Sequence, residues 1–238
     1  MHKFAKGLTH LLFGLAIYYP LSPLIADTAF TIKSPNIIMV LADDMNWFDI
    51  AAYHQMLDYV PKNAITPNID KLAKEGMLFT QSFTSTAMCG VTRQQLYTGI
   101  YPIRNGAYGN HTRVYDGIKS AAHYFRELGY RVGLAGKGHV FPGKSFPFAR
   151  VGKENKGAEG ESTFGIEKTR KFMARNKAQP FFLIAASANP HTPWNRGNTK
   201  QYPPHKLQVP EFLNDTPALR QKLSKYLAEV TDLDREVG

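Results

Sequence analysis

Two stretches of the sequence carry side chains that could bind a metal ion or attack an ester. Asp43 and Asp44 are adjacent carboxylates, and carboxylate oxygens are the ligands that hard cations such as Ca²⁺ and Mg²⁺ prefer. Cys89 lies four residues before Arg93, so a helix beginning near residue 90 places both side chains on one side. Both features also have ordinary explanations, because an Asp pair often caps a turn and a lone cysteine often packs in a core.

Three more basic side chains lie in short polar stretches further along the chain. Lys137 and His139 belong to a Gly-Lys-Gly-His stretch, and His191 lies in an Asn-Pro-His-Thr-Pro-Trp stretch. Together with Arg93 they can surround an anion with charge-assisted hydrogen bonds. A nucleophile beside a metal ion and several such donors is the arrangement that hydrolysis of a charged ester requires. Four other histidines are interpreted as structural or surface residues: His54, His111, His123 and His205.

Predicted strands precede each group of reactive side chains. Continuous apolar runs at residues 35–41 and 181–186 are typical of strands that are buried on both faces. Residues 77–83 and 131–135 are predicted as two further strands. In chain order, Asp43 and Asp44 follow the segment 35–41, and Cys89 follows 77–83. Lys137 follows 131–135, and His191 follows 181–186.

Predicted helices alternate with the strands. Apolar residues at helical spacing predict helices over residues 66–76, 118–128 and 219–233, the first with Thr66 as its N-cap. This alternation predicts an α/β fold with a mostly parallel sheet covered by helices. Ligands of such sheets bind beyond the carboxyl ends of the strands, so we expect the candidate residues to meet there.

Composition and charge narrow the class of protein. The chain has 238 residues, 43% of them hydrophobic, which fits a globular domain with a sizeable core. Its single cysteine excludes an internal disulfide framework and a zinc site built from cysteines. The net charge of +10 favours an anionic partner, but the basic residues form no stripe, so we expect no nucleic-acid partner.

The first residues are predicted to direct export. Residues 1–26 combine an early pair of lysines, a short apolar run and prolines before Ala26, the pattern of a signal peptide. The apolar run is too short to span a bilayer, so we expect no membrane span. The mature domain is then 27–238, located in the periplasm or outside the cell.

Five stretches resemble, in order, the motifs of the type I sulfatases, a family of the alkaline-phosphatase-like superfamily. They are residues 35–47, 66–73, 89–99, 136–139 and 190–193. The segment 207–238 is similar to the heparan N-sulfatase branch, and its last residues resemble the helix before the family's second metal motif. The resemblance implies an alkaline-phosphatase-like sulfatase N-terminal domain.

The resemblance also implies a role for each candidate residue. In the family the motif cysteine is oxidised by a formylglycine-generating enzyme to formylglycine, whose hydrated aldehyde attacks sulfur and then expels sulfate. The implied metal ligands of Ca²⁺, or less readily Mg²⁺, are Asp43, Asp44 and residue Cys89. The implied residues that hold formylglycine and sulfate or assist proton transfer are Arg93, Lys137, His139 and His191. The implied substrate is a sulfated glycan.

The sequence departs from the family pattern at two points. Val91 stands where the family has Pro or Ala, and Thr92 stands where it has Ser; we expect an unconverted Cys89 to be nearly inactive toward sulfate esters. Family members are roughly twice as long, so we expect this chain to be the N-terminal half of a sulfatase, weak or inactive by itself, with an exposed apolar sheet edge. The alternatives are a phosphonate or phosphate monoester hydrolase of the same superfamily and a non-catalytic binder of anionic glycans.

Overall fold

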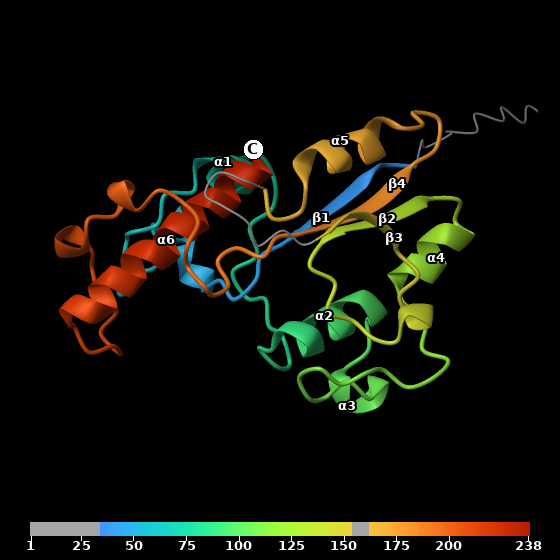
Figure 1. Ribbon diagram of the computed structural model, residues 1–238, viewed down its shortest axis with the longest axis horizontal. Helices are drawn as coiled ribbons and strands as arrows, with labels where there is room; N and C mark the ends of the chain where they lie inside the picture. The colour runs from blue at the N-terminus through green and yellow to red at the C-terminus, as the bar shows by residue number, and fades with distance from the viewer. Residues whose placement is uncertain (1–33, 154–161) are drawn as a thin grey trace, which may run out of the picture. The chain divides into compact units, whose positions relative to one another are not determined.

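The strands form one four-stranded sheet in the computed structural model, which describes residues 34–153 and 162–238. They are β1 (Ile37–Leu41), β2 (Arg131–Gly136), β3 (Ala149–Lys153) and β4 (Phe181–Ala186). Their order is β1-β4-β2-β3, and all three neighbouring pairs are parallel (Figure 1). The predicted mostly parallel sheet is therefore confirmed, whereas the predicted signal peptide lies outside the described residues.

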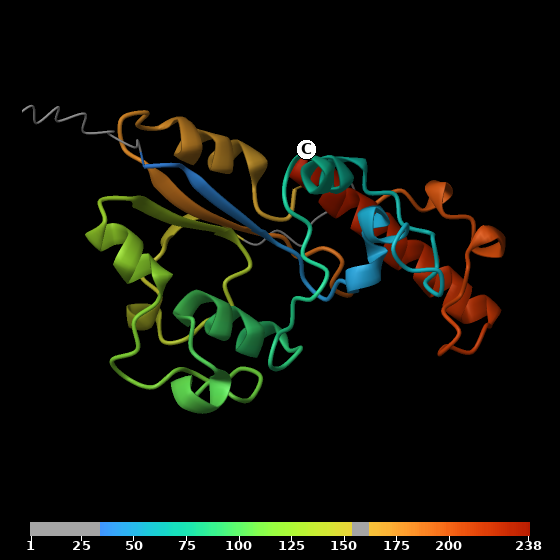
Figure 2. The same ribbon diagram turned by 180° about the vertical axis from the view of Figure 1, so that it is seen from behind.

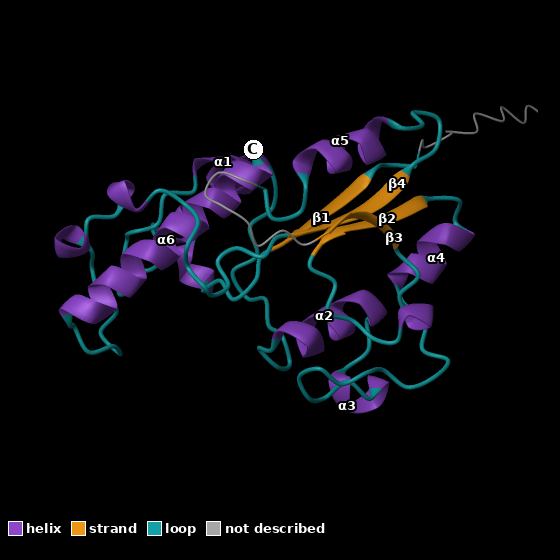
Figure 3. Cartoon of the chain, viewed as in Figure 1, coloured by secondary structure: helices purple, strands orange, loops and turns teal. Residues whose placement is uncertain are grey.

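Within residues 34–153 and 162–238, six α-helices and five short 3-10 helices accompany the sheet (Figure 3). The α-helices are α1 (Pro67–Glu75), α2 (Cys89–Thr98), α3 (Pro102–Asn105), α4 (Ala121–Glu127), α5 (Ile166–Ala174) and α6 (Pro217–Val237). The 3-10 helices are η1 (Trp47–Asp49), η2 (Ala51–Tyr53), η3 (Gly143–Ser145), η4 (Thr199–Gln201) and η5 (Pro204–Lys206). In the described residues, no helix has both the length and the apolar character needed to cross a bilayer.

Helices cover both faces of the centre of the sheet. All six residues of β4 are buried, and successive side chains point to opposite faces. Phe182 stacks on Phe125 of α4 with the ring centroids 4.3 Å apart, while Ala185 packs against Phe164 on the face that α5 covers. Figures 1 and 2 show α4 and α5 on opposite sides of the sheet. This two-sided burial explains why β4 reads as a continuous apolar run.

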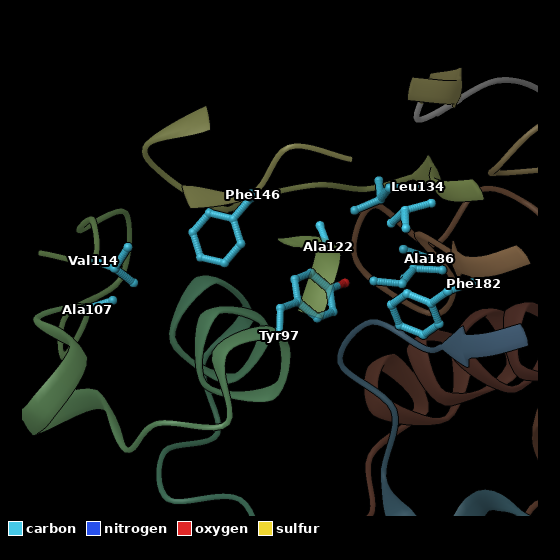
Figure 4. Packing of buried hydrophobic residues seen from close by; sticks show 10 residues of the cluster. Tyr97, Ala107, Val114, Ala122, Leu134, Phe146, Phe182 and Ala186 are labelled. Atoms are coloured by element: carbon cyan, nitrogen blue, oxygen red, sulfur yellow. The ribbon is translucent and has the colours of Figure 1, made fainter. Parts of the chain in front are cut away.

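The larger core cluster joins α2 to the sheet (Figure 4). Tyr97 of α2 is 2% exposed and packs with Ala122 of α4, Leu134 of β2 and Phe182 of β4. Its ring meets that of Phe146 edge to face, with the centroids 6.5 Å apart. This packing fixes α2, and with it Cys89 at the first turn, relative to the ends of the strands.

Two predictions about strands are wrong. The first strand expected to be buried on both faces is β1, which lies at the end of the strand order; its residues alternate between half-buried and exposed, with Ile38 and Val40 52% and 41% exposed. Residues 77–83 form a loop in which Met77 and Phe83 are 78% and 86% exposed. An apolar run does not form a strand without a neighbour to pair with, and in the described part of the chain this run has none.

The predicted helices agree better with the structure. The first begins after Thr66 and ends before Gly76, and the long last helix is α6, so both are confirmed. The helix expected from residue 118 begins only at Ala121. Its start is set by a capping box, in which the backbone N–H of Ser120 donates to Nδ1 of His123 at 3.2 Å. The predicted helix near residue 90 is α2, which begins at Cys89.

Candidate active site

Three of the candidate side chains come from neighbouring strand ends. Asp43 follows β1, Lys137 follows β2 and His191 follows β4, and parallel strands bring their carboxyl ends to one edge of the sheet. Backbone hydrogen bonds hold this edge together: the N–H of Asp43 donates to the carbonyl of Asn189 at 3.0 Å, and that of Lys137 to Ala186 at 3.0 Å. The fourth element is the start of α2, which carries Cys89.

Asp43 is the buried centre of the cluster. Its Oδ1 accepts a hydrogen bond from Nη2 of Arg93 at 3.2 Å, and its Oδ2 accepts one from Nζ of Lys137. Asp43 and Arg93 are both 2% exposed, and Arg93 also donates to the carbonyl of Lys137 at 3.2 Å. Burial acts to raise the pKa of Asp43, but the Lys137 hydrogen bond and both positive charges lower it overall. The carboxylate is therefore ionised at neutral pH.

Asp44 faces the thiol and a histidine. Sγ of Cys89 donates to Oδ1 of Asp44 at 3.3 Å, and Nε2 of His191 lies 3.6 Å from Oδ2. Nδ1 of His191 lies 2.6 Å from the carbonyl of Thr192, which can only accept, so Nδ1 carries the hydrogen. Nε2 then faces the Asp44 carboxylate, and these two groups are both of a type that binds metal ions.

The Cys89 thiol is a poor nucleophile in this setting. Burial, and then the negative charge of Asp43, raise the pKa of Cys89 from 9.0 to about 11, although Lys137 acts in the opposite direction. Only the thiolate attacks or binds metals well, and it is scarce at neutral pH under these conditions. The site thus favours the protonated thiol over the thiolate at this position.

A pocket of about 380 Å³ opens over these groups, and its walls include Asp43, Asp44, Cys89 and Arg93. Ligand atoms of Asp43, Cys89 and His191 all lie within 4.8 Å of one another. The carboxylates of Asp43 and Asp44 suit a hard cation, whereas a protonated thiol does not. Lys137 does not line the pocket but pairs with Asp43, and the two carboxylates balance the charges of Arg93 and Lys137, so these four side chains together carry no net charge that would attract an anion.

His139 does not hydrogen-bond to the other candidates; it pairs with His111. Its Nε2 lies 2.9 Å from Nδ1 of His111, and both residues have left-handed backbones with φ of 51° and 63°. A Cβ added to Gly90 would lie 3.3 Å from that Nε2, so His139 packs against the start of α2. Burial first, and then the positive charges near it, lower the pKa of His139. His111 was interpreted above as structural, and no sequence spacing indicates this contact.

A match to a known protein family spans all of the candidate residues. A family model described as Sulfatase matches residues 35–238. The chain belongs to the sulfatase family. Among curated proteins, it is 36% identical over 160 residues to an ulvan-active sulfatase of Formosa agariphila. It is 30% identical over 236 residues to the human N-sulphoglucosamine sulphohydrolase.

Solved sulfatase-like structures share the same architecture. A Bacteroides thetaiotaomicron protein, solved in work on the metabolism of multiple glycosaminoglycans, matches with a TM-score of 0.68 and 20% identity, over 84% of this chain and 56% of its own. The phosphonate monoester hydrolase of Agrobacterium radiobacter matches with a TM-score of 0.66 and 17% identity, over 86% and 58%. At these identities the likeness concerns the fold alone.

This sulfatase chain spans less than half the length of the two curated relatives. The match covers 67% of this chain and 31% of the Formosa protein, and 85% of this chain and 45% of the human protein. The described residues therefore correspond to one portion of those proteins.

Proposed function

We propose that the strand-end cluster is the nucleophile-bearing and sulfate-binding part of a sulfatase active site that hydrolyses sulfate esters or sulfamates of a sulfated glycan. The strand-end cluster consists of Asp43, Asp44, Cys89, Arg93, Lys137 and His191. The observation that carries this proposal is the buried Asp43 held between Arg93 and Lys137, with Cys89 and Asp44 in contact beside it. Two sulfatase relatives support the glycan class, since their names specify ulvan and N-sulphoglucosamine.

Residue 89 would act after conversion of Cys89 to formylglycine by a formylglycine-generating enzyme, a partner met during export. The hydrated aldehyde supplies two hydroxyls on one carbon, one to attack sulfur and one to release sulfate. The raised pKa of the Cys89 thiol supports this assignment, because the unmodified side chain offers neither an effective thiolate nor a second hydroxyl.

The carboxylates fit a hard cation, with Ca²⁺ favoured over Mg²⁺. Asp43, Asp44 and an oxygen function at residue 89 would hold it, and it would supply positive charge beside the bound sulfate. Since Asp43 and Asp44 balance the charges of Arg93 and Lys137, we expect binding of a sulfate ester to depend on this cation.

The remaining side chains have roles that follow from their positions. Lys137 and Arg93 keep the Asp43 carboxylate ionised and oriented, and Lys137, 12% exposed, is able to donate to the sulfate as well. Nε2 of His191 lies 3.6 Å from Oδ2 of Asp44, which lines the pocket, and we assign His191 the transfer of a proton to the leaving group. His139 packs against Gly90 and so limits movement of the first turn of α2.

Hydrolysis of phosphonate or phosphate monoesters is the second candidate. It is favoured by the fold likeness to phosphonate monoester hydrolases from Agrobacterium radiobacter and Silicibacter pomeroyi. A third reading, a non-catalytic binder of anionic glycans, predicts that retention on heparin persists in Cys89→Ala without any turnover of sulfate esters.

The experiment that tests the proposal measures two things: whether Cys89 is converted to formylglycine, and whether the chain prefers a sulfated sugar to a phosphonate. The chain is co-expressed with a formylglycine-generating enzyme, and the peptide containing residue 89 is analysed by mass spectrometry. Calorimetry with Ca²⁺ present then compares the binding affinity of the chain for N-sulfoglucosamine with its affinity for a phenylphosphonate monoester. The proposal predicts formylglycine and preference for the sulfated sugar; an unmodified cysteine together with preference for the phosphonate overturns it.

A further inference from the structure

A second pocket adjoins the candidate active site. It has a volume of about 290 Å³ and shares Asp44 and Asn46 with the first pocket. Oδ1 of Asp44 is the atom that accepts the hydrogen bond from Cys89, so a residue in contact with Cys89 also lines the second pocket. We call this second cavity the apolar pocket; it lies among η1, the loop after β4, the segment before α6, and α6 itself.

The walls of the apolar pocket are mostly aromatic and aliphatic. Phe48, Trp194 and Tyr226 contribute rings, and Phe212 and Leu213 close the side formed by the loop before α6. Its volume is close to the lower end of the range of about 300–1,000 Å³ that small-molecule pockets occupy, which suits a single ring. Apolar walls with few polar groups match the C–H faces of a sugar ring.

Trp194 is held rigidly in this wall. Its Nε1–H donates to the carbonyl of Pro190 at 2.8 Å, and its ring meets that of Tyr226 edge to face, with the centroids 5.8 Å apart. Trp194 also lies three residues after His191 in the same loop. The stacking surface and the histidine of the candidate active site are therefore positioned by one segment.

One basic and two acidic side chains line the apolar pocket, namely Lys222, Asp44 and Asp49, and the carboxylate oxygens of Asp44 contact Cys89 and His191 in the candidate active site. Lys222 of α6 lines it and is exposed. The carboxylate of Asp49 is turned away into hydrogen bonds, accepting from the Tyr226 hydroxyl at 2.8 Å and from Nδ2 of Asn46 at 3.1 Å. Lys222 is thus available to a carboxylate or sulfate group on a bound ring.

We infer that the apolar pocket binds the sugar ring next to the one whose sulfate lies at residue 89, so that the substrate is a sulfated disaccharide or longer glycan. This inference rests on the proposed function. It assigns ring stacking to Trp194 and recognition of the ring's acidic group to Lys222.

The two tryptophans of the chain allow a direct test. Trp47 is 54% exposed and does not line the apolar pocket, so Trp47→Phe leaves Trp194 as the only indole reporter. This variant is titrated, with Ca²⁺ present, with N-sulfoglucosamine and with a heparin-derived disaccharide that contains it. The disaccharide is expected to shift the Trp194 emission and to bind at least about tenfold more tightly than the monosaccharide.

Two variants and a matched control then test whether the tighter binding of the disaccharide arises in the apolar pocket. Lys222→Met and Leu213→Ser, both at exposed positions, are expected to remove most of the preference for the disaccharide. Lys225→Met changes an exposed lysine on the same helix that does not line the pocket, and it is expected to keep the preference. Binding of the monosaccharide stays unchanged in all three.

The outcomes separate this inference from the proposed function. If the monosaccharide binds but the disaccharide binds no more tightly and leaves the Trp194 emission unchanged, the apolar pocket is not a sugar site and the proposed function stands. If neither sugar binds, both are overturned. A preference that persists in Lys222→Met and Leu213→Ser, or a Trp194 emission that changes with protein concentration alone, also overturns the inference, the latter because a second copy then fills the pocket.

Discussion

The titration of the Cys89 thiol depends directly on the arrangement of charges in the site. Its pKa of about 11, against an ordinary 9.0, corresponds to a thiolate fraction about 100-fold lower near neutral pH. Replacing Asp43 in Asp43→Asn removes a negative charge beside the thiol, so the pKa should fall. Burial, the largest cause, remains, so it should stay above 9.0. Lys137→Met removes a positive charge and should raise the pKa further.

The assay is alkylation of the only cysteine in the chain by iodoacetamide, followed by mass spectrometry. In the folded protein the rate should rise about tenfold per pH unit up to about pH 10, whereas in urea-unfolded protein it should level off near pH 9. The two variants should move the profile in opposite directions. A folded profile that levels off near pH 9, or variants that both move it the same way, would refute the account of the site's electrostatics.

Four further predictions concern stability and association. Arg93→Met leaves the buried Asp43 with Lys137 as its remaining cation and should cost about 3 kcal/mol in urea unfolding; a loss below about 1 kcal/mol contradicts a buried ion pair. Because the folded pKa of Asp43 is lowered, its contribution to stability is present above the ordinary value of 3.8 and should be lost as pH falls through the folded pKa, which acid unfolding measures. Asp234→Ala removes a carboxylate that accepts from the first backbone N–H groups of α1 and should cost about 0.5–2 kcal/mol in thermal unfolding, whereas no loss excludes this cap. Ile38→Lys with Val40→Lys should reduce self-association of the chain, measured by light scattering, because both apolar side chains are exposed on the end strand β1. Unchanged self-association would show that β1 does not mediate it.

The parts of the fold that the sequence predicts are those encoded by a local pattern. The apolar run of β4 and the spacing of α6 are long enough to specify their own secondary structure, and the parallel connection then brings Asp43, Lys137 and His191 to one edge. The spacing of Cys89 and Arg93 suits a helix that begins near residue 90, and α2 begins at Cys89. These features do not depend on which distant segment packs where.

The parts that the sequence does not predict depend on distant partners. The run at residues 77–83 has a strand-like pattern, but whether it pairs is decided elsewhere in the chain. His111 reaches His139 because both loops adopt left-handed backbones, which no spacing encodes. Asp234 lies on α6, yet it caps α1, and this contact joins residues more than 160 positions apart.

The most direct test of the central claim is a calorimetric titration of the chain with N-sulfoglucosamine, with Ca²⁺ present and after chelation. The account predicts saturable binding that requires Ca²⁺, weakens at least about tenfold in Lys137→Met and is unchanged in Lys144→Met. Lys144 is the matched control, because its side chain is 63% exposed and pairs with Asp116. Equal binding by both variants, or binding that persists without the cation, would contradict the claim that the strand-end cluster recognises a sulfate group.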